Sequence, residues 1–421
     1  MNRSSESFPL APRLTDEAPA EQPGGSARQV DIAIVGGGIS GSLAAAVLGR
    51  SGFRVALVDI HRTHPQEFRC EKLAYEQLDL LRGLGLFDCL TAVGKPVHQM
   101  HVVRFGRLVD RLDSEEYGFF YEKFVNTVRA RLPSQVEFVV GRVADLSTGP
   151  DLQRVTLTNG DVLDARLIIL ASGLDDSLRQ KLGISRRVIR ESHSLSIGFS
   201  AAPGAGKSFA FPALTYYGDR LAERIGYISF FPVMDEMRAN LFCYRGHDAA
   251  WVHAVRDNPR ETLFKAMPNL ERFVGDFEIV GKVKARVADL YQVENHRRDG
   301  VLLIGDAFQT TCPAAGNGVT RVLTDVNRLC KVHVPRWFAS PGMTAAKISE
   351  FYDDPVKLAC DAWCSRLAEY GRSFATDGSP MWHARRWKAF LRPQLRGWNK
   401  RSTTRQGGPV AARAPAIATR L

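Results

Sequence analysis

The sequence predicts an α/β fold in which a domain with a parallel sheet is interleaved with a second domain built on a mixed or antiparallel sheet, followed by C-terminal helices. Three observations support this prediction. Near the start, an apolar strand, a glycine-rich turn, a helix and a second apolar strand follow one another. The middle of the chain has long, aromatic-rich stretches of alternating polarity. A buried strand over Gly300–Gly305 then resembles the first strand again, so the chain returns to the first domain.

The first strand, helix and second strand form a βαβ unit. Residues Val30–Val35 are apolar, largely β-branched and end at three glycines, which predicts a buried parallel strand. A helix is expected over Ser40–Arg50, with small alanines for close packing, and a second strand over Arg54–Asp59.

The glycines have the G-x-G-x-x-G spacing of a dinucleotide-binding turn: Gly36, Gly38 and Gly41. The first permits a tight turn, the second lets the backbone approach a pyrophosphate, and the third lets helix pack on strand. The N-terminus of the helix, at Ser40, offers N–H groups to the phosphates, and Asp59 can bind ribose hydroxyls. The motif predicts a Rossmann-like FAD/NAD(P)-binding domain but does not distinguish FAD from NAD.

The remaining elements and the domain limits follow from periodicity. Helices are expected over Glu71–Leu86, Lys123–Leu132, Pro259–Met267 and in the region Thr344–Arg372, and strands over Val136–Val140, Arg154–Leu157, Arg166–Leu170, Gly226–Pro232 and Arg238–Tyr244. The expected divisions are a disordered lead (1–29), the cofactor-binding domain (30–190), a β-sheet substrate domain (191–296), the return to the first domain (297–336), a C-terminal helical region (337–400) and a basic flexible tail (401–421).

A second motif follows the late strand. Asp306 stands at the end of that strand, where its carboxylate can bind a ribityl hydroxyl. The Pro- and Gly-rich loop over Pro313–Val319 can lie against a ring system as it enters a helix. The dipole of that helix would stabilise negative charge on the pyrimidine edge of a reduced flavin. A strand-turn-helix with a capping Asp is the alternative.

Together the two motifs resemble the FAD-dependent aromatic hydroxylases typified by p-hydroxybenzoate hydroxylase, a group of single-component flavoprotein monooxygenases. The fingerprint of the second motif matches at Gly305, Asp306, Ala307, Pro313, Gly316, Gly318 and Asp325. The resemblance implies an FAD cofactor and NAD(P)H as electron donor. It also implies that a flavin C4a-hydroperoxide hydroxylates or epoxidises a small aromatic or unsaturated molecule with O2.

The resemblance assigns site residues to the cofactor alone. Arg69 is similar to the arginine that reaches the FAD, and Val143 to the position whose backbone meets the adenine. The full set expected at the cofactor is Gly36, Gly38, Ser40, Gly41, Asp59, Arg69, Val143, Asp306, Pro313, Gly316, Asn317, Gly318 and Val319. No catalytic side chain and no metal ligand is named.

The sequence departs from the family pattern in three places. Gln309 and Thr320 replace a His and an Asn, and the family's D-G fingerprint is shortened to the segment 173–179. Because that segment assists FAD and nicotinamide in the family, NAD(P)H docks differently here or a partner reductase supplies electrons. An FAD-dependent reductase, a halogenase and a flavin-free carrier of the same fold remain alternatives. The Trp-x-Trp-x-Ile-Pro motif of halogenases is absent from the sequence.

The net charge of +11 comes from the C-terminal end. Residues 380–421 hold ten Lys and Arg and no acidic residue, which leaves +1 on the first 379 residues and argues against nucleic acid as a partner. The Trp- and Arg-rich segment Trp382–Asn399, in which Pro393 is expected to interrupt the helix, suits a packing helix. A weak contact with a membrane surface or a carrier is the alternative. Seven scattered cysteines favour the cytoplasm, with peripheral membrane attachment as an option.

Overall fold

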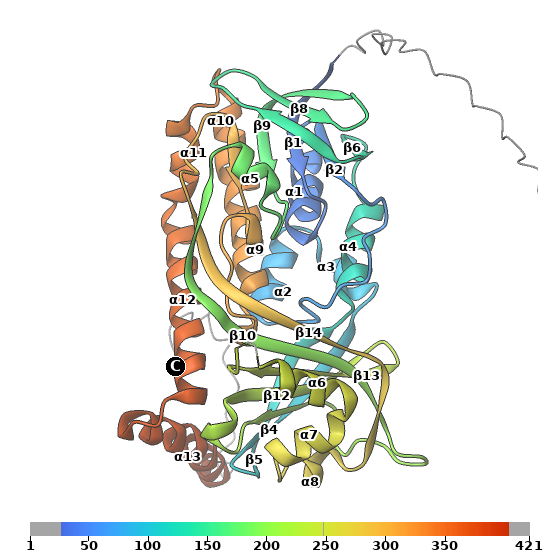
Figure 1. The fold of residues 1–421 in the computed structure, drawn as a ribbon, viewed down its shortest axis with the longest axis vertical. Coiled ribbons are helices and arrows are strands. Elements are labelled where there is room, and N and C mark those ends of the chain that lie inside the picture. The colour runs from blue at the N-terminus through green and yellow to red at the C-terminus, as the bar shows by residue number, and fades with distance from the viewer. Residues whose placement is uncertain (1–26, 247, 404–421) are drawn as a thin grey trace, which may run out of the picture.

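Two β-sheets organise the part of the chain that the computed structural model describes, residues 27–246 and 248–403 (Figure 1). The first sheet has seven strands in the order β6-β2-β1-β9-β8-β7, with β15 also paired to β9. The second sheet has eight strands in the order β14-β10-β13-β12-β11-β4-β5-β3. The strands are β1 (Arg28–Val35), β2 (Val55–Asp59), β3 (Lys72–Ala74), β4 (Lys95–Arg104), β5 (Arg107–Gly118), β6 (Val136–Val140), β7 (Val143–Ser147), β8 (Gln153–Leu157), β9 (Val162–Leu170), β10 (Ser185–Pro203), β11 (Leu214–Tyr217), β12 (Ile225–Val233), β13 (Glu236–Cys243), β14 (Phe277–Glu294) and β15 (Val301–Leu303).

Helices pack against both sheets and close the chain. They are α1 (Ile39–Arg50), α2 (Glu76–Gly83), α3 (Phe87–Thr91), α4 (Tyr121–Ala130), α5 (Ser177–Lys181), α6 (Ala249–Asp257), α7 (Pro259–Ala266), α8 (Glu271–Val274), α9 (Gly318–Arg328), α10 (Val334–Phe338), α11 (Ala345–Tyr352), α12 (Pro355–Thr376) and α13 (Pro380–Thr403). The predicted fold class is confirmed. Strands β1, β2, β6, β9 and β15 pair in parallel, and the second sheet is antiparallel except for the parallel pair β4 and β11.

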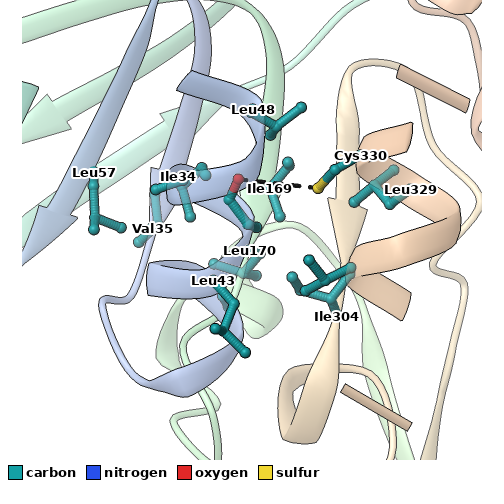
Figure 2. Packing of buried hydrophobic residues seen from close by; sticks show 14 of the residues in the cluster. Ile34, Val35, Leu43, Leu48, Leu57, Ile169, Leu170, Ile304, Leu329 and Cys330 are labelled. Carbon is teal, nitrogen blue, oxygen red and sulfur yellow. Dashed lines mark hydrogen bonds between the residues drawn. The ribbon is translucent and has the colours of Figure 1, made fainter. Parts of the chain in front are cut away.

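The first core lies around α1. Figure 2 shows the side chains of α1 between those of the parallel sheet and those of the segment after α9. Leu43 and Leu48 of α1 share this core with Ile169 and Ile304. Every residue from Ile39 to Gly49 is buried. Because the helix is enclosed on all sides, only small or apolar residues fit most of its surface. The predicted helix over residues 40–50 therefore corresponds to α1.

One predicted helix is wrong at its start. The segment 71–86 was expected to be a single helix, but Lys72–Ala74 forms β3 and pairs antiparallel with Glu116–Gly118. The helix α2 begins only at Glu76. Leu73 therefore packs in the core as a strand residue, because pairing with a distant strand overrides the local helical period.

The second sheet also takes strands from an early part of the chain. Strands β4 and β5 form a hairpin, and β4 pairs with β11 through His101, Val102 and Val103. The sequence did not predict this hairpin. The domain boundaries given above remain a prediction.

A long two-stranded ribbon joins the two halves of the molecule. Strand β10 has 19 residues and β14 has 18, and they pair antiparallel along their length. In Figure 1 the ribbon runs from the upper, α1-containing half into the lower sheet, beside the long helix α12. Both halves are thus connected by the backbone pairing of this ribbon, which register shifts interrupt at three places.

The chain ends differ from expectation by a few residues. β1 begins at Arg28, inside the predicted disordered lead, because Arg28 pairs with Leu163. The helix α13 runs through Pro393 instead of ending there, and it reaches Thr403 within the predicted tail. The rest of the predicted lead and tail, residues 1–26 and 404–421, lies outside the described residues. Within the described ranges, none of the helices has the length and apolar character needed to span a bilayer.

Candidate functional site

A cavity of about 550 Å³ is lined by residues from both sheets. Ten of the thirteen residues expected at the cofactor line it: Gly36, Gly38, Ser40, Asp59, Arg69, Asp306, Pro313, Gly316, Gly318 and Val319. Gly41, Val143 and Asn317 are not among the lining residues. The cavity therefore brings together the turn after β1, the loop after β2 and the loop after β15.

The glycine turn after β1 has no room for side chains at two of its positions. Gly36 has φ +101°, and a Cβ there would lie 2.4 Å from the carbonyl oxygen of Ala171. A Cβ on Gly41 would lie 1.9 Å from the carbonyl oxygen of Gly36, which explains why Gly41 serves packing and not the cavity surface. At Gly38 the nearest atom would be the Tyr121 hydroxyl at 3.5 Å, so the backbone is open to a ligand.

The two predicted motifs meet at this turn. Gly305 has φ +63°, and a Cβ on it would lie 2.3 Å from the Ser40 hydroxyl oxygen. Glycine at position 305 therefore lets the end of β15 approach the first turn of α1. The tertiary structure thus joins two segments that are far apart in the sequence.

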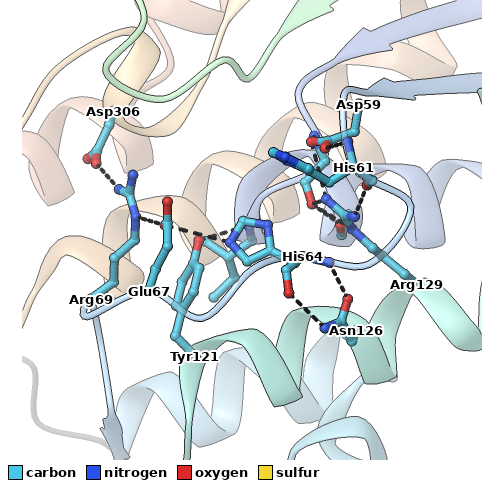
Figure 3. A network of polar contacts seen from close by, with 12 residues as sticks. Asp59, His61, His64, Glu67, Arg69, Tyr121, Asn126, Arg129 and Asp306 are labelled. Carbon is cyan, nitrogen blue, oxygen red and sulfur yellow. Dashed lines mark hydrogen bonds and ion pairs between the residues drawn. The ribbon is translucent and has the colours of Figure 1, made fainter. Parts of the chain in front are cut away.

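Asp59 and Arg129 hold the glycine turn in place (Figure 3). Asp59 Oδ2 accepts the Gly37 N–H at 2.6 Å, and its Oδ1 accepts the His61 N–H at 2.8 Å. Arg129 from α4 donates twice to the Gly37 carbonyl, at 2.9 and 2.6 Å, and its Nη2 lies 3.2 Å from Asp59. A carboxylate has about four acceptor positions, so Asp59 retains capacity for a ribose hydroxyl.

A chain of charged groups leads from the loop after β2 to Asp306 (Figure 3). Glu67 accepts from Arg69 Nε at 2.5 Å, and Arg69 Nη1 donates to Asp306 Oδ2 at 3.2 Å. The His64 ring, whose Nε2 lies 3.6 Å from Glu67 Oε2, and the charge of Arg69 outweigh burial and lower the pKa of Glu67 to about 2. Arg69 is therefore fixed at the cavity, and its Nη2 makes no hydrogen bond to the described residues.

The loop that enters α9 is tethered from three directions. The Tyr227 hydroxyl on β12 donates to the Ala314 carbonyl at 2.9 Å, and Gln77 Nε2 donates to the Gly316 carbonyl at 2.8 Å. Asn317 is 1% exposed and donates through Nδ2 to the Cys364 carbonyl at 3.2 Å. Asn317 thus anchors the loop to α12, whereas Gly316 and Gly318 face the cavity.

The shortened segment 173–179 contacts the residues that follow β15. Arg179 is 1% exposed, and its Nη1 donates to the Ala307 carbonyl at 2.7 Å and to the Tyr291 hydroxyl at 3.3 Å. Tyr291 in turn donates to the Asp306 carbonyl at 2.6 Å. Arg179 therefore holds the backbone around Asp306 by hydrogen bonds, while Gly173 and Leu174 line the cavity.

The residues present fit a dinucleotide. The turn at Gly38 is open to backbone contact, Arg69 has a free guanidinium edge for a phosphate, and Asp59 has free acceptor positions. The start of α9 at Gly318 adds N–H groups that have no partner within the helix.

Arg129 and Tyr121 are site residues that sequence reasoning missed. Tyr121 accepts the Ile39 N–H at 3.1 Å, at the start of α1. Arg129 lies on the same buried stripe of α4 as Phe124, Val125 and Val128. An arginine on an apolar stripe needs a buried partner, which is the signal that could have identified it.

Comparison with known proteins gives one family and a set of relatives. A family model described as an FAD binding domain matches residues 29–332. The squalene monooxygenase of Mus musculus is 25% identical over 357 residues, covering 76% of this chain and 58% of the relative. A ubiquinone hydroxylase of Rhodospirillum rubrum is 26% identical over 396 residues, covering 86% of each chain. The chain thus spans 58% of the mouse relative's length.

A solved structure shares the fold. The p-nitrophenol 4-monooxygenase of Pseudomonas putida superposes with a TM-score of 0.68 at 16% identity, over 89% of this chain and 98% of that chain. These matches confirm the resemblance noted from the two motifs.

Proposed function

Because the chain belongs to the family of FAD-binding domains that matches residues 29–332, we propose that it is an FAD-dependent monooxygenase acting on a small aromatic or unsaturated molecule. The observation that supports this most strongly is that one cavity is lined by both glycine loops, by Arg69 and Asp306, and by aromatic residues of the second sheet. Two relatives are named for squalene and ubiquinone, which supports an unsaturated substrate.

The chain's own residues would bind and orient the cofactor. The backbone at Gly36 and Gly38 and the free edge of Arg69 would hold the pyrophosphate, and Asp59 the ribose. Asp306 would accept from the ribityl chain, and the loop 313–319 would lie beside the isoalloxazine. When bound and reduced, FAD supplies the electrons that activate O2 for transfer of one oxygen atom to the substrate.

The second sheet would exclude water and position the substrate. Phe231 on β12 and Phe242 on β13 line the cavity and offer apolar surface, and Phe68 adds to it from the loop after β2. Tyr227 lies on the same sheet, and its hydroxyl donates a hydrogen bond to the Ala314 carbonyl. The sheet that would hold the substrate is thus in contact with the loop that would hold the flavin. No side chain at the cavity is assigned a proton-transfer role.

We propose NAD(P)H as the electron donor, with a partner reductase as the alternative. The cations Arg186 and Arg286 line the cavity and suit a phosphorylated nicotinamide. Arg179 is committed to backbone carbonyls and is not available for one. Oxidation of NADH and of NADPH by the purified protein, followed separately, decides between direct reduction and a requirement for another protein.

The cofactor and the reaction are tested in two steps. Purified protein that neither shows flavin absorbance nor binds added FAD would contradict the proposal and favour a flavin-free carrier. Product analysis then separates the reactions: a mass gain of one oxygen supports a monooxygenase, addition of two hydrogens a reductase, and addition of a halogen a halogenase.

We further propose a weak contact of the C-terminal helix with an anionic membrane surface. Helix α13 exposes Met381, Trp387 and Leu391, and the ring of Phe105 lies 5.4 Å from that of Trp387. The same helix exposes the cations Arg385, Lys388 and Arg392. This combination suits a lipid interface.

Co-sedimentation with vesicles tests the membrane contact. We expect a Trp387→Ser/Leu391→Ser variant to bind vesicles of phosphatidylserine and phosphatidylcholine less than the wild-type protein does. Equal binding would contradict the contact and leave α13 as a packing helix.

A further inference from the structure

A glutamine outside the cavity binds the loop that leads into α9. Gln77, in the first turn of α2, is 8% exposed, and its Nε2 donates to the Gly316 carbonyl at 2.8 Å and to the Thr320 hydroxyl oxygen at 3.0 Å. Its Oε1 accepts the Ala74 N–H at 3.0 Å. Gly316 lines the cavity and Gln77 does not. Thr320 is one of the positions at which the sequence departs from the family pattern, so this contact is a feature of the present chain.

The contact with Ala74 fixes which end of the Gln77 amide faces the loop. A backbone N–H can only donate, so the amide oxygen points to Ala74 and the amide N–H groups point to the loop and to α9. Ala74 itself is held in β3, where it pairs with Glu116 of β5. Helix α2 packs beside α9 (Figure 1). Gln77 therefore presents a donor that a strand and a helix hold in place.

This donor decides how the peptide group between Gly316 and Asn317 is turned. In a trans peptide the C=O and the N–H point in opposite directions. Because the Gly316 oxygen points to Gln77, which does not line the cavity, the Asn317 N–H points away from Gln77. That N–H makes no hydrogen bond within the part of the chain that the structure describes. With the peptide reversed, a carbonyl oxygen would take its place.

The two residues that flank this peptide tolerate both of its orientations. Reversing a peptide group changes ψ of the residue before it and φ of the residue after it by about 180°. Gly316 has φ +66° and ψ 11°, and reversal would give it an extended ψ at the same positive φ, a conformation that is essentially restricted to glycine. Asn317, with φ −103°, would move to a positive φ, where asparagine is enriched. Backbone sterics alone therefore do not select the orientation.

The other contacts of Asn317 leave this choice open. Its side-chain amide donates to the Cys364 carbonyl, and its own carbonyl accepts the Arg321 N–H. These bonds hold the side chain and the peptide that follows Asn317, not the peptide that precedes it. Among the described residues, the Gly316 oxygen accepts a hydrogen bond from Gln77 alone. The present orientation thus depends on Gln77.

We propose that Gln77 is a positioning residue that selects the orientation of the Gly316–Asn317 peptide, so that an N–H donor and not a carbonyl oxygen faces the flavin. This inference rests on the proposed function, because it requires FAD beside the loop 313–319. Reduction places negative charge on the pyrimidine edge of a flavin. An N–H stabilises that charge, whereas a carbonyl oxygen opposes it. Gln77 therefore favours the binding of reduced over oxidised FAD without touching the cofactor.

The reduction potential of bound FAD tests this role without turnover. Gln77→Leu keeps the size of the side chain and removes its donors. We expect the affinity for reduced FAD, relative to that for oxidised FAD, to fall about tenfold or more, because hydrogen bonds to charged groups are strong. A tenfold change lowers a two-electron potential by about 30 mV, which is measured by reducing the FAD-loaded protein together with a reference dye. An unchanged or higher potential would overturn the proposal.

A second substitution separates the peptide orientation from other effects of losing Gln77. Gly316→Ala fits the present φ +66° and ψ 11°, where a Cβ would meet no atom within 4 Å, but it does not fit the reversed peptide. We therefore expect Gln77→Leu to lower the potential at most about half as much in the Gly316→Ala background as in the wild-type protein. Equal decreases in both backgrounds would show that Gln77 acts without the peptide and would overturn the proposal.

Hydrogen exchange decides the question if the Gly316→Ala protein does not retain FAD. With FAD bound, we expect the Asn317 N–H to exchange roughly tenfold faster in Gln77→Leu than in the wild-type protein. Gln153→Leu is the matched control, because Gln153 is also buried and donates to a backbone carbonyl, that of Gly149, but does not line the cavity. Equal exchange in Gln77→Leu and the wild-type protein, or a similar increase in the control, would overturn the assignment.

The outcome is separable from that of the proposed function. If Gln77→Leu lowers the potential as expected but no oxygen is incorporated into any product, the role of Gln77 stands and the monooxygenase assignment fails. If a substrate is oxygenated but the potential is the same in Gln77→Leu and the wild-type protein, the role of Gln77 fails and the monooxygenase assignment stands. Protein that binds no FAD would contradict both.

Discussion

Arg69 Nη1 lies 3.2 Å from Asp306 Oδ2, although 237 positions of sequence separate the two residues. Their contact joins the loop after β2 to the end of β15 and places both at the edge of the cavity. Glu67 holds the guanidinium from its other side. The pair thus positions the cationic and the anionic group that a dinucleotide with a ribityl chain would require.

Loss of charge at Asp306 should weaken FAD binding. Asp306→Asn loses the ion pair with Arg69, and we expect the dissociation constant for FAD to rise roughly ten- to hundredfold, in line with about 1.5–3 kcal/mol for a hydrogen bond to a charged group. Fluorescence of released FAD measures this. The control is Arg82→Gln, which removes a pair with Asp79 outside the cavity. Unchanged affinity in Asp306→Asn would contradict the role of the pair.

Arg129 should stabilise the glycine turn. A lysine at position 129 cannot make both hydrogen bonds to the Gly37 carbonyl. We therefore expect Arg129→Lys to lower the free energy of unfolding by about 1–3 kcal/mol and to weaken FAD binding. Arg131→Lys serves as control, because Arg131, directly after the helix, donates to the Asp88 carbonyl in an exposed contact. Thermal denaturation with and without FAD measures both effects. Equal shifts in the two variants would refute a special role.

Gly36 should tolerate no side chain. Gly36→Ala adds a Cβ 2.4 Å from the Ala171 carbonyl oxygen at φ +101°, whereas Gly52→Ala adds one at φ +91° with no atom within 4 Å. Both variants bear the backbone strain of about 1–2 kcal/mol, and Gly36→Ala should cost about 1–3 kcal/mol more. Chemical denaturation compares them. Similar losses would show that the close approach to Ala171 is unimportant.

The buried pair Lys357 and Asp325 should hold α12 against α9. Its Nζ to Oδ1 distance is 2.8 Å, and each side chain is 1% exposed. Lys357→Met leaves the buried Asp325 without its cation and should cost about 3–5 kcal/mol, part of which Asp325→Asn added to it should recover. As a control, Arg297→Met removes the exposed ion pair with Asp353 and should lower the free energy of unfolding by at most about 1 kcal/mol. Additive losses in the double variant would contradict the coupling.

His193 should make stability depend on pH. Burial, with the nearby charges of Arg372 and Arg190, lowers the pKa of His193 from 6.5 to about 4. The unfolded chain therefore binds the proton first, so stability is lost as the pH falls from about 6.5 to about 4. We expect His193→Phe to flatten the melting temperature over this range, and the exposed His253→Asn to leave it unchanged. If the melting temperature of His193→Phe changed with pH as steeply as that of the wild-type protein, this role of His193 would be refuted.

Local patterns predicted much of the first half of the site. The spacing of Gly36, Gly38 and Gly41 placed the turn correctly at the end of β1, because a strand, a tight turn and a helix are specified by neighbouring residues. The same reasoning failed for Lys72–Ala74, whose strand conformation depends on pairing with residues more than forty positions later. Arg129 was missed because its partners, at Gly37 and Asp59, are brought to it only by the fold.

The sequence by itself determined the class of the protein: a βαβ unit, a second strand-loop-helix motif at Asp306, and a basic C-terminal end. Only the tertiary structure decided which residues share the cavity. Asn317, next in sequence to Gly316 and Gly318, turns to α12, while Ser196, Ser229 and Asn240 come together from three strands. The physical reason is that backbone motifs depend on short-range sterics, whereas a side-chain site depends on strand register and on pairing between distant segments.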